Sequence, residues 1–170
     1  MINTSDRTVI KRRGQSAYGG LGTTLRYGGI ELDILLQGVS QTMTNLRNHY
    51  TTMPGRMSNQ PLAYLGQYWL KPGDIATMQR PSSGSNAAAN TAQSNYTSSE
   101  AVNSDASFIR LKNVSLAYRT SRLIPGKAVK FSLQGQNLYT WSDYLGLDPE
   151  SASLSLPPLR TITLSLNLSL

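Results

Sequence analysis

The sequence contains no cysteine and only one histidine among its 170 residues. Without cysteine the chain has no disulfide, no thiolate nucleophile and none of the usual structural zinc sites. Charged residues make up only 15% of the chain and hydrophobic residues 39%, which is little apolar material for a tightly packed soluble core. No apolar run approaches the roughly 18 residues of a membrane helix, and the amino-terminal residues lack the apolar stretch of a secretory signal. The chain is therefore expected to be a β protein with long polar loops or a wet interior.

Positive charge exceeds negative charge, with 16 Lys and Arg against 9 Asp and Glu. Apart from residues 11–13, however, the basic side chains are scattered and are not interleaved with aromatic ones, so no nucleic-acid partner is expected. No Gly-x-Ser-x-Gly elbow accompanies the single histidine, His49, which lies in a polar segment. No glycine-rich phosphate loop and no metal-spaced cluster is present either. We therefore expect no enzyme activity, no cofactor and no metal.

The end of the chain shows the clearest structural pattern. From Thr161 on, apolar residues alternate without a break with small, neutral polar residues. Successive side chains of a strand point to opposite faces, so this pattern predicts a strand with one oily and one polar face. A membrane-spanning β-barrel has such strands, with apolar residues toward lipid and polar residues toward the lumen. A half-buried strand of a soluble sandwich shows the same alternation, so the other segments must decide.

Similar alternation recurs along the chain, with Gly28-Gly29 and Pro125-Gly126 as tight-turn signals and a change of phase near Lys112-Asn113 that indicates a β-bulge. Residues 42–105 are different, because they are rich in Pro, Gly, Ser and Asn. No more than a brief helical turn, at residues 87–89, is expected there, and this connection is expected to be mobile. The sequence thus predicts an antiparallel meander of five strands near residues 18–27, 30–40, 107–120, 128–141 and 159–170.

Short and long connections alternate strictly in this meander. All short turns therefore fall at one end of the sheet and all long loops at the other, as in outer-membrane barrels. Two carboxylates, Glu31 and Asp33, alternate with apolar residues, which suits a face bathed in water better than a dry core. Tyr27 and Tyr118 flank the short turns, as an aromatic girdle would. The pattern favours a transmembrane barrel over the alternative, a soluble β-domain that binds carbohydrate.

Several motifs resemble those near the end of SusC/RagA-type TonB-linked outer-membrane proteins. Residues 107–118 (SFIRLKNVSLAY) resemble the family's "LRLKN" strand, and residues 131–140 (FSLQGQNLYT) resemble its "GQNLfT" strand. The DPE tripeptide at 148–150 is similar to the loop that follows, and residues 158–168 are similar to the closing strand. Upstream, residues 18–21 and 30–38 resemble a hairpin that precedes these motifs.

The resemblance implies a fold and a function. The fold is all-β, the terminal part of a transmembrane barrel of about 22 strands. Residues 1–17 would be an incomplete loop, 18–170 the carboxy-terminal part of the barrel, and 42–105 a long extracellular loop. The implied function is import of oligosaccharides or peptides across the outer membrane of a Gram-negative, Bacteroidota-like bacterium. The partners would be membrane lipid, a SusD-like lipoprotein, and the TonB complex acting through a plug that this chain lacks, so we expect the chain to be a fragment that does not transport by itself.

Two sets of residues are candidates for a functional role. Flat aromatic faces stack on sugars, so the candidates for ligand contact are Tyr68, Trp69, Trp141 and Tyr144. For Trp141 a place in the aromatic girdle is the stronger interpretation. Alternation assigns the lumen-facing set as Glu31, Asp33, Thr163, Ser165 and Asn167. Asp148 and Glu150 form a second carboxylate pair, interpreted as turn formers beside Pro149 rather than as weak calcium ligands.

Overall fold

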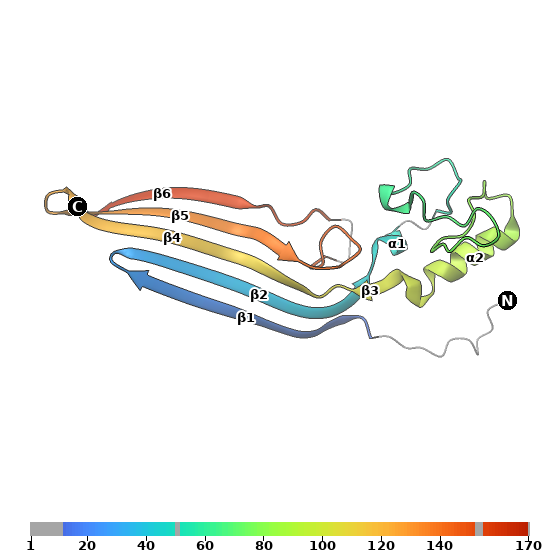
Figure 1. Ribbon diagram of the computed structural model, residues 1–170, viewed down its shortest axis with the longest axis horizontal. Helices are drawn as coiled ribbons and strands as arrows, with labels where there is room; N and C mark the ends of the chain where they lie inside the picture. The colour runs from blue at the N-terminus through green and yellow to red at the C-terminus, as the bar shows by residue number, and fades with distance from the viewer. Residues whose placement is uncertain (1–11, 50–51, 152–154, 170) are drawn as a thin grey trace.

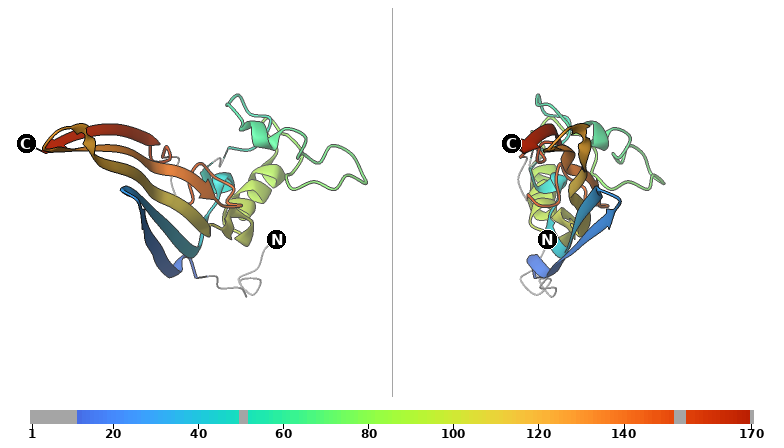
Figure 2. Two further views of the ribbon diagram at one scale, coloured as in Figure 1. Left: turned by 60° about the vertical axis from the view of Figure 1, so that its left-hand side comes forward. Right: turned by 90° about the vertical axis from the view of Figure 1, so that its left-hand side faces the viewer.

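A computed structural model describes residues 12–49, 52–151 and 155–169. The chain forms one twisted and curved antiparallel sheet with a cluster of loops and short helices at one end (Figures 1 and 2). The strands follow the order β1-β2-β4-β5-β6, and the short strand β3 pairs with β2 beside this path. The predicted meander and its all-β class are therefore confirmed. The strands are β1 (Gly14–Tyr27), β2 (Ile30–Thr44), β3 (Asn103–Asp105), β4 (Phe108–Ile124), β5 (Lys127–Trp141) and β6 (Thr161–Ser169).

Both predicted tight turns are present. Gly28 and Gly29 link β1 to β2 with φ of 54° and 87°, the left-handed values that a two-residue hairpin turn requires at both positions. Pro125 and Gly126 link β4 to β5, and Gly126 has a φ of 74°. Figure 1 shows both turns at one end of the sheet and both long connections at the other. The sorting of short and long connections is thus a property of the structure.

The phase change in the sequence is a β-bulge, as predicted. The pairing of β4 with β5 shifts between Leu111 and Asn113, so that Lys112 has no directly opposite residue. On β5 the same irregularity places Asn137 at a φ of 52°, and this residue is the one non-glycine residue with positive φ in the described chain. The bulge lets apolar residues on both sides of it stay on one face.

Register assigns the two faces of the sheet without ambiguity, because directly paired residues point to the same side. Leu164 pairs with Leu133, which pairs with Leu116, and the row continues through Leu32 to Leu25. The next row is polar and runs from Thr163 through Gln134, Ser115 and Asp33 to Thr24. The rows through Ser165 and Asn167 lie on the same side as the row that contains Asp33. Glu31 pairs with Ala117, then Ser132 and Ser165. The expectation that Glu31 and Asp33 share a face with the polar residues of β6 is therefore correct.

The connection between β2 and β4 is more structured than the sequence suggested. It contains the helices α1 (Leu46–His49) and α2 (Ala87–Thr97), the 3-10 turns η2 (Leu62–Tyr64) and η3 (Glu100–Val102), and strand β3. The expectation of only a brief turn at 87–89 is wrong, because α2 runs for 11 residues. Asn86 begins it, since its side-chain oxygen accepts hydrogen bonds from the backbone N–H groups of Ala88 and Ala89. No helix in the described residues is long and apolar enough to cross a membrane.

Strand ends differ from the expected ones by a few residues. β1 begins at Gly14, inside the segment assigned to an incomplete loop, and β2 continues to Thr44, inside the segment assigned to the long loop. β4 continues to Ile124, past the expected end at 120. Residues 1–11 and Leu170 lie outside the described residues. Most buried apolar side chains gather at the loop end of the sheet and in its connections: Val39, Met53, Tyr64, Met78, Val102, Ala106 and Phe108.

Candidate functional site

The polar face of the sheet is a hydrogen-bonded surface made by neighbouring strands. The Thr24 hydroxyl donates to Asp33 at 2.5 Å, and the Gln134 amide donates to Asn113 at 2.9 Å. Arg26 and Glu31 form a cross-strand ion pair at 3.0 Å. The Arg26 side chain is 72% exposed, so water screens this pair and its contribution to stability is small. The face can contact water and polar solutes without leaving a buried charge unpaired.

The opposite face is apolar, and many of its large side chains are exposed, whereas those near the centre of the sheet are half-buried. On β6 the exposed fractions are 73% for Ile162, 79% for Leu164 and 65% for Leu166. Because large apolar patches on soluble monomers rarely exceed a few hundred Å², a face of this extent indicates contact with lipid or another apolar surface.

Aromatic residues lie near both ends of this apolar face. At the turn end Tyr27, Tyr118 and Phe131 lie in one row across four strands, linked by Ile30. At the loop end Tyr139 and Trp141 lie two residues apart on β5, on the same face, with their ring centroids 4.7 Å apart. From Phe131 to Trp141 the strand rises about 33 Å at roughly 3.3 Å per residue. At a tilt of about 40° this is about 25 Å along the membrane normal, the height of the apolar band of an outer-membrane barrel.

The four aromatic residues expected to contact ligand occupy separate places. Tyr68 and Trp69 belong to the β2–β4 connection, where Tyr68 forms an isolated bridge with Met78. Trp141 lies on the apolar face with Tyr139, in the girdle position. Tyr144 is half-buried in the loop after β5, and its hydroxyl donates to the Thr44 carbonyl at 2.5 Å. No ring contact between these residues appears in the described part of the chain, so they do not form one aromatic platform.

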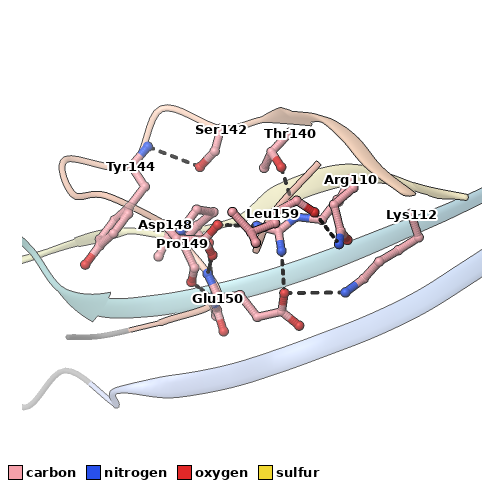
Figure 3. A network of polar contacts seen from close by, with 12 residues as sticks. Arg110, Lys112, Thr140, Ser142, Tyr144, Asp148, Pro149, Glu150 and Leu159 are labelled. Atoms are coloured by element: carbon pink, nitrogen blue, oxygen red, sulfur yellow. Dashed lines mark hydrogen bonds and ion pairs between the residues drawn. The ribbon is translucent and has the colours of Figure 1, made fainter. Parts of the chain in front are cut away.

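A buried ion-pair network lies on the polar face at the loop end (Figure 3). Arg110 of β4 is only 1% exposed, and its guanidinium meets Asp148 at 2.6 Å and Glu150 at 2.5 Å. Its Nε donates to the Thr140 hydroxyl at 2.9 Å, and the guanidinium lies 5.1 Å from the centre of the Phe108 ring. Residues 142–151, called the 142–151 loop below, are therefore folded back over the polar face.

Further hydrogen bonds fix the 142–151 loop to the sheet. The Gln41 side chain donates to the Pro149 carbonyl, and the backbone N–H of Leu46 donates to the Leu145 carbonyl at 2.7 Å. The Glu150 N–H donates to the Asp148 carboxylate at 2.8 Å, so Asp148 is also the turn former that the sequence indicated. A buried guanidinium without carboxylate partners would be costly, which makes this loop and Arg110 mutually dependent.

Arg110 is the residue that sequence reasoning did not single out. One signal was available, since Arg110 alternates with apolar residues of β4 at a position that register assigns to the polar face. The motif at residues 107–118 therefore offered a basic partner for the carboxylates of the DPE tripeptide at 148–150. In the described residues no group of three potential metal ligands occurs. Asp148 and Glu150 instead both form ion pairs with Arg110.

Two groups at this end have shifted pKa values. Partial burial raises the pKa of the Tyr144 phenol above its ordinary value. Hydrogen bonds from the hydroxyl and the backbone N–H of Ser107 lower the pKa of the Asp105 carboxyl. Both shifts favour the protonation state that holds the loop end together at neutral pH.

Comparison with known proteins finds two similar curated sequences and several solved structures of the same fold. No family model matches the chain. Two curated proteins of Formosa agariphila do: TonB-dependent receptor P3 is 25% identical over 98% of this chain, and TonB-dependent receptor P26 is 28% identical over 99% of it. The resemblance to TonB-dependent receptors is confirmed. The chain spans 18% of the length of each of these curated relatives.

Solved structures show the same fold as this segment. The RagAB peptide importer in its open-open state matches 99% of the chain with a TM-score of 0.71 and 22% identity, and the chain covers 19% of that structure's chain. The closed-closed state of the same importer matches 89% of the chain with a TM-score of 0.64. The chain thus has the fold of one part of this importer.

Proposed function

We propose that this chain forms part of the wall of a TonB-dependent transporter in the outer membrane of a Gram-negative bacterium. The observation that carries the proposal is the two-faced sheet, in which an exposed apolar face with aromatic ends backs a hydrogen-bonded polar face. In this orientation the apolar face contacts lipid. Glu31, Asp33, Thr163, Ser165 and Asn167 face the lumen.

The material imported is an oligosaccharide or a peptide, captured together with a SusD-like lipoprotein. Energy comes from the TonB complex acting through a plug in the longer protein. The similarity to TonB-dependent receptors and the fold shared with a peptide importer support this assignment. The long connections at one end of the sheet form the outer, ligand-facing side, and the two short turns face the periplasm.

Within this transporter the described strands act as part of a larger barrel. Within the described part of the chain β1 and β6 each pair with one neighbour, which leaves a row of unpaired backbone N–H and C=O groups along their outer edges. Such edges are not tolerated in lipid, because no water is present to satisfy these groups. Further strands must therefore cover both edges in the membrane, and these 170 residues alone do not form a transport path.

The 142–151 loop has a structural role in this account. Arg110 holds it against the polar face, and it therefore narrows the lumen at the outer end instead of extending from the barrel. Its position is fixed by the buried ion pair of Arg110 with Asp148, which therefore helps to set the shape of the lumen there.

The behaviour of the isolated chain tests the proposal. Produced alone, the 170-residue chain should aggregate in aqueous buffer and become soluble only with detergent, because its apolar face has neither lipid nor barrel neighbours. Size-exclusion chromatography with and without detergent measures this. A monodisperse monomer without detergent that melts cooperatively would overturn the proposal and favour a soluble carbohydrate-binding domain.

A further inference from the structure

A polar pocket lies between helix α2 and the segment that follows α1. Its volume is about 380 Å³. Among the residues that the structure describes, no acidic side chain lines the pocket, whereas a guanidinium, two amides and three hydroxyl groups do. Its lining residues are Thr52, Met53, Arg56, Asn90, Gln93, Ser94 and Thr97.

Helix α2 supplies one wall of this pocket through its periodicity. Asn90, Gln93, Ser94 and Thr97 are spaced i, i+3, i+4 and i+7, so they lie on one face of the helix. Apolar residues would be expected at this spacing if the face served only to pack against the rest of the protein. The helix instead presents a polar stripe to the pocket.

The guanidinium of Arg56 is held in place by a hydrogen bond to a side chain of helix α2. Its Nη2 donates to the Asn90 side-chain oxygen at 3.1 Å, and the Asn90 amide donates to the Gly84 carbonyl at 2.9 Å. The guanidinium lies so close to Gly84 that a Cβ at this position would collide with it, and Gly84 also has a φ of 93°. Among the described residues no carboxylate pairs with Arg56, so a positioned cation keeps most of its donors free.

Gln93 provides an independent sign of a missing ligand. Its side chain is only 7% exposed, and its Oε1 accepts a hydrogen bond from Gln79 at 3.3 Å. Its Nε2, however, is buried without an acceptor among the described residues. Buried polar atoms are almost always hydrogen-bonded, so an unpartnered donor in the wall of a polar pocket indicates an acceptor that is supplied from outside.

We propose that this pocket binds a carboxylate group of the imported material, with Arg56 as the cationic fork and the Gln93 amide as a second donor. A planar carboxylate can accept two N–H groups from a guanidinium and still accept a third donor. The group can belong to a peptide or to an acidic sugar. As a capture site this inference rests on the proposed transport function, but binding is measured separately from transport.

Binding is measured by isothermal titration calorimetry on the full chain in detergent. Two matched probe pairs are used: a tetrapeptide with a free terminal carboxylate against its amide, and trigalacturonic acid against its methyl ester. The carboxylate form of at least one pair should bind and its neutral form should bind at least about tenfold more weakly, since hydrogen bonds to charged groups are worth about that much. The pair that shows the difference identifies the source of the carboxylate.

Three variants separate the site from a general charge effect. Arg56→Gln removes the cation, and Gln93→Glu keeps the shape and the bond from Gln79 but replaces the donor by a negative charge. Each should reduce carboxylate binding at least about tenfold. Arg80→Gln removes an exposed guanidinium of the same connection that does not line the pocket, and should leave binding unchanged. Circular dichroism melts show whether each variant is folded.

The results either support or overturn the site. Binding that is lost in both folded site variants and kept in Arg80→Gln supports it. Absence of binding by the folded wild-type chain, equal affinity for charged and neutral probes, or unchanged binding in Gln93→Glu would overturn it. A chain that binds carboxylates but is a detergent-free monomer would keep the site and refute the transporter assignment.

Discussion

Replacement of Asp148 by Asn should release the 142–151 loop from the polar face of the sheet. The substitution keeps the shape of the side chain but removes one of the two carboxylates that face Arg110. Arg110 is 1% exposed and Asp148 4%, so the remaining charge stays buried, and its other partner, Glu150, is 43% exposed. Breaking a buried pair by removal of one partner costs about 3 to 5 kcal/mol.

At the lower end of that range the opening equilibrium of the loop changes about 150-fold, since about 1.4 kcal/mol corresponds to a factor of ten. Hydrogen–deuterium exchange on the chain in detergent measures it. The amides to follow are Leu46, Glu150 and Ser151, whose N–H groups bond across or within the loop. Protection at these amides should fall by about this factor, while the centre of the sheet keeps its protection.

Two further variants make the reasoning refutable. Glu31→Gln breaks the exposed pair with Arg26 and should leave the protection of the loop nearly unchanged, because water screens this pair. Arg110→Met combined with Asp148→Leu replaces the buried pair by apolar groups, which is often nearly neutral, and should restore much of the lost protection. If Asp148→Asn leaves the loop as protected as Glu31→Gln does, the buried pair does not hold the loop.

Four other substitutions test local features. Gly29→Ala should lower the melting temperature and cost more than about 1 kcal/mol, because Gly29 has a φ of 87° and its added Cβ would lie 2.7 Å from the Arg119 carbonyl oxygen. Gly28 has a φ of 54° and open space around it, so Gly28→Asn should leave the melting temperature nearly unchanged. Equal losses of melting temperature in the two variants would contradict this account of the turn. Asn86→Ala should cost about 1 kcal/mol in the stability of α2, seen as faster amide exchange at its first turn; unchanged exchange would contradict the cap. Burial raises the pKa of Tyr144, so the stability that the neutral phenol gives to the loop is complete below about pH 10 and is lost as the pH rises through the raised pKa. Tyr144→Phe should remove this loss of loop protection at alkaline pH. A loss that persists in the variant would show that another group causes it.

The strands could be predicted from the sequence because their signals are local. Alternation at period two, a Gly-Gly turn and a Pro-Gly turn each act within a few residues, and together they determined order, pairing and faces. Even the bulge near Lys112 was visible, because a slip of one residue moves every apolar side chain to the other face. The ends of the strands were less predictable, since pairing partners such as β3 extend β2 beyond its alternating part.

The remaining features depend on contacts distant in sequence. Helix α2 contains polar residues with weak helix preference, and a side-chain cap at Asn86 and the neighbouring segment stabilise it more than its own composition does. The Arg110 network joins residues 38 and 40 positions apart, so its carboxylates looked like turn formers alone. Likewise, the proposed carboxylate site depends on Arg56 and Gln93, which lie in separate segments with no shared motif.

Site-directed spin labelling of β6 tests the central assignment most directly. The sequence has no cysteine, so each introduced cysteine carries the only label. Leu164→Cys and Leu166→Cys report on the apolar face, and Thr163→Cys and Ser165→Cys report on the polar face, in the chain solubilised in detergent micelles. The account predicts that the leucine positions are accessible to oxygen, which concentrates in lipid, and shielded from a water-soluble nickel chelate, with the reverse at the polar positions. Equal access of the nickel chelate to all four positions would contradict a lipid-facing wall.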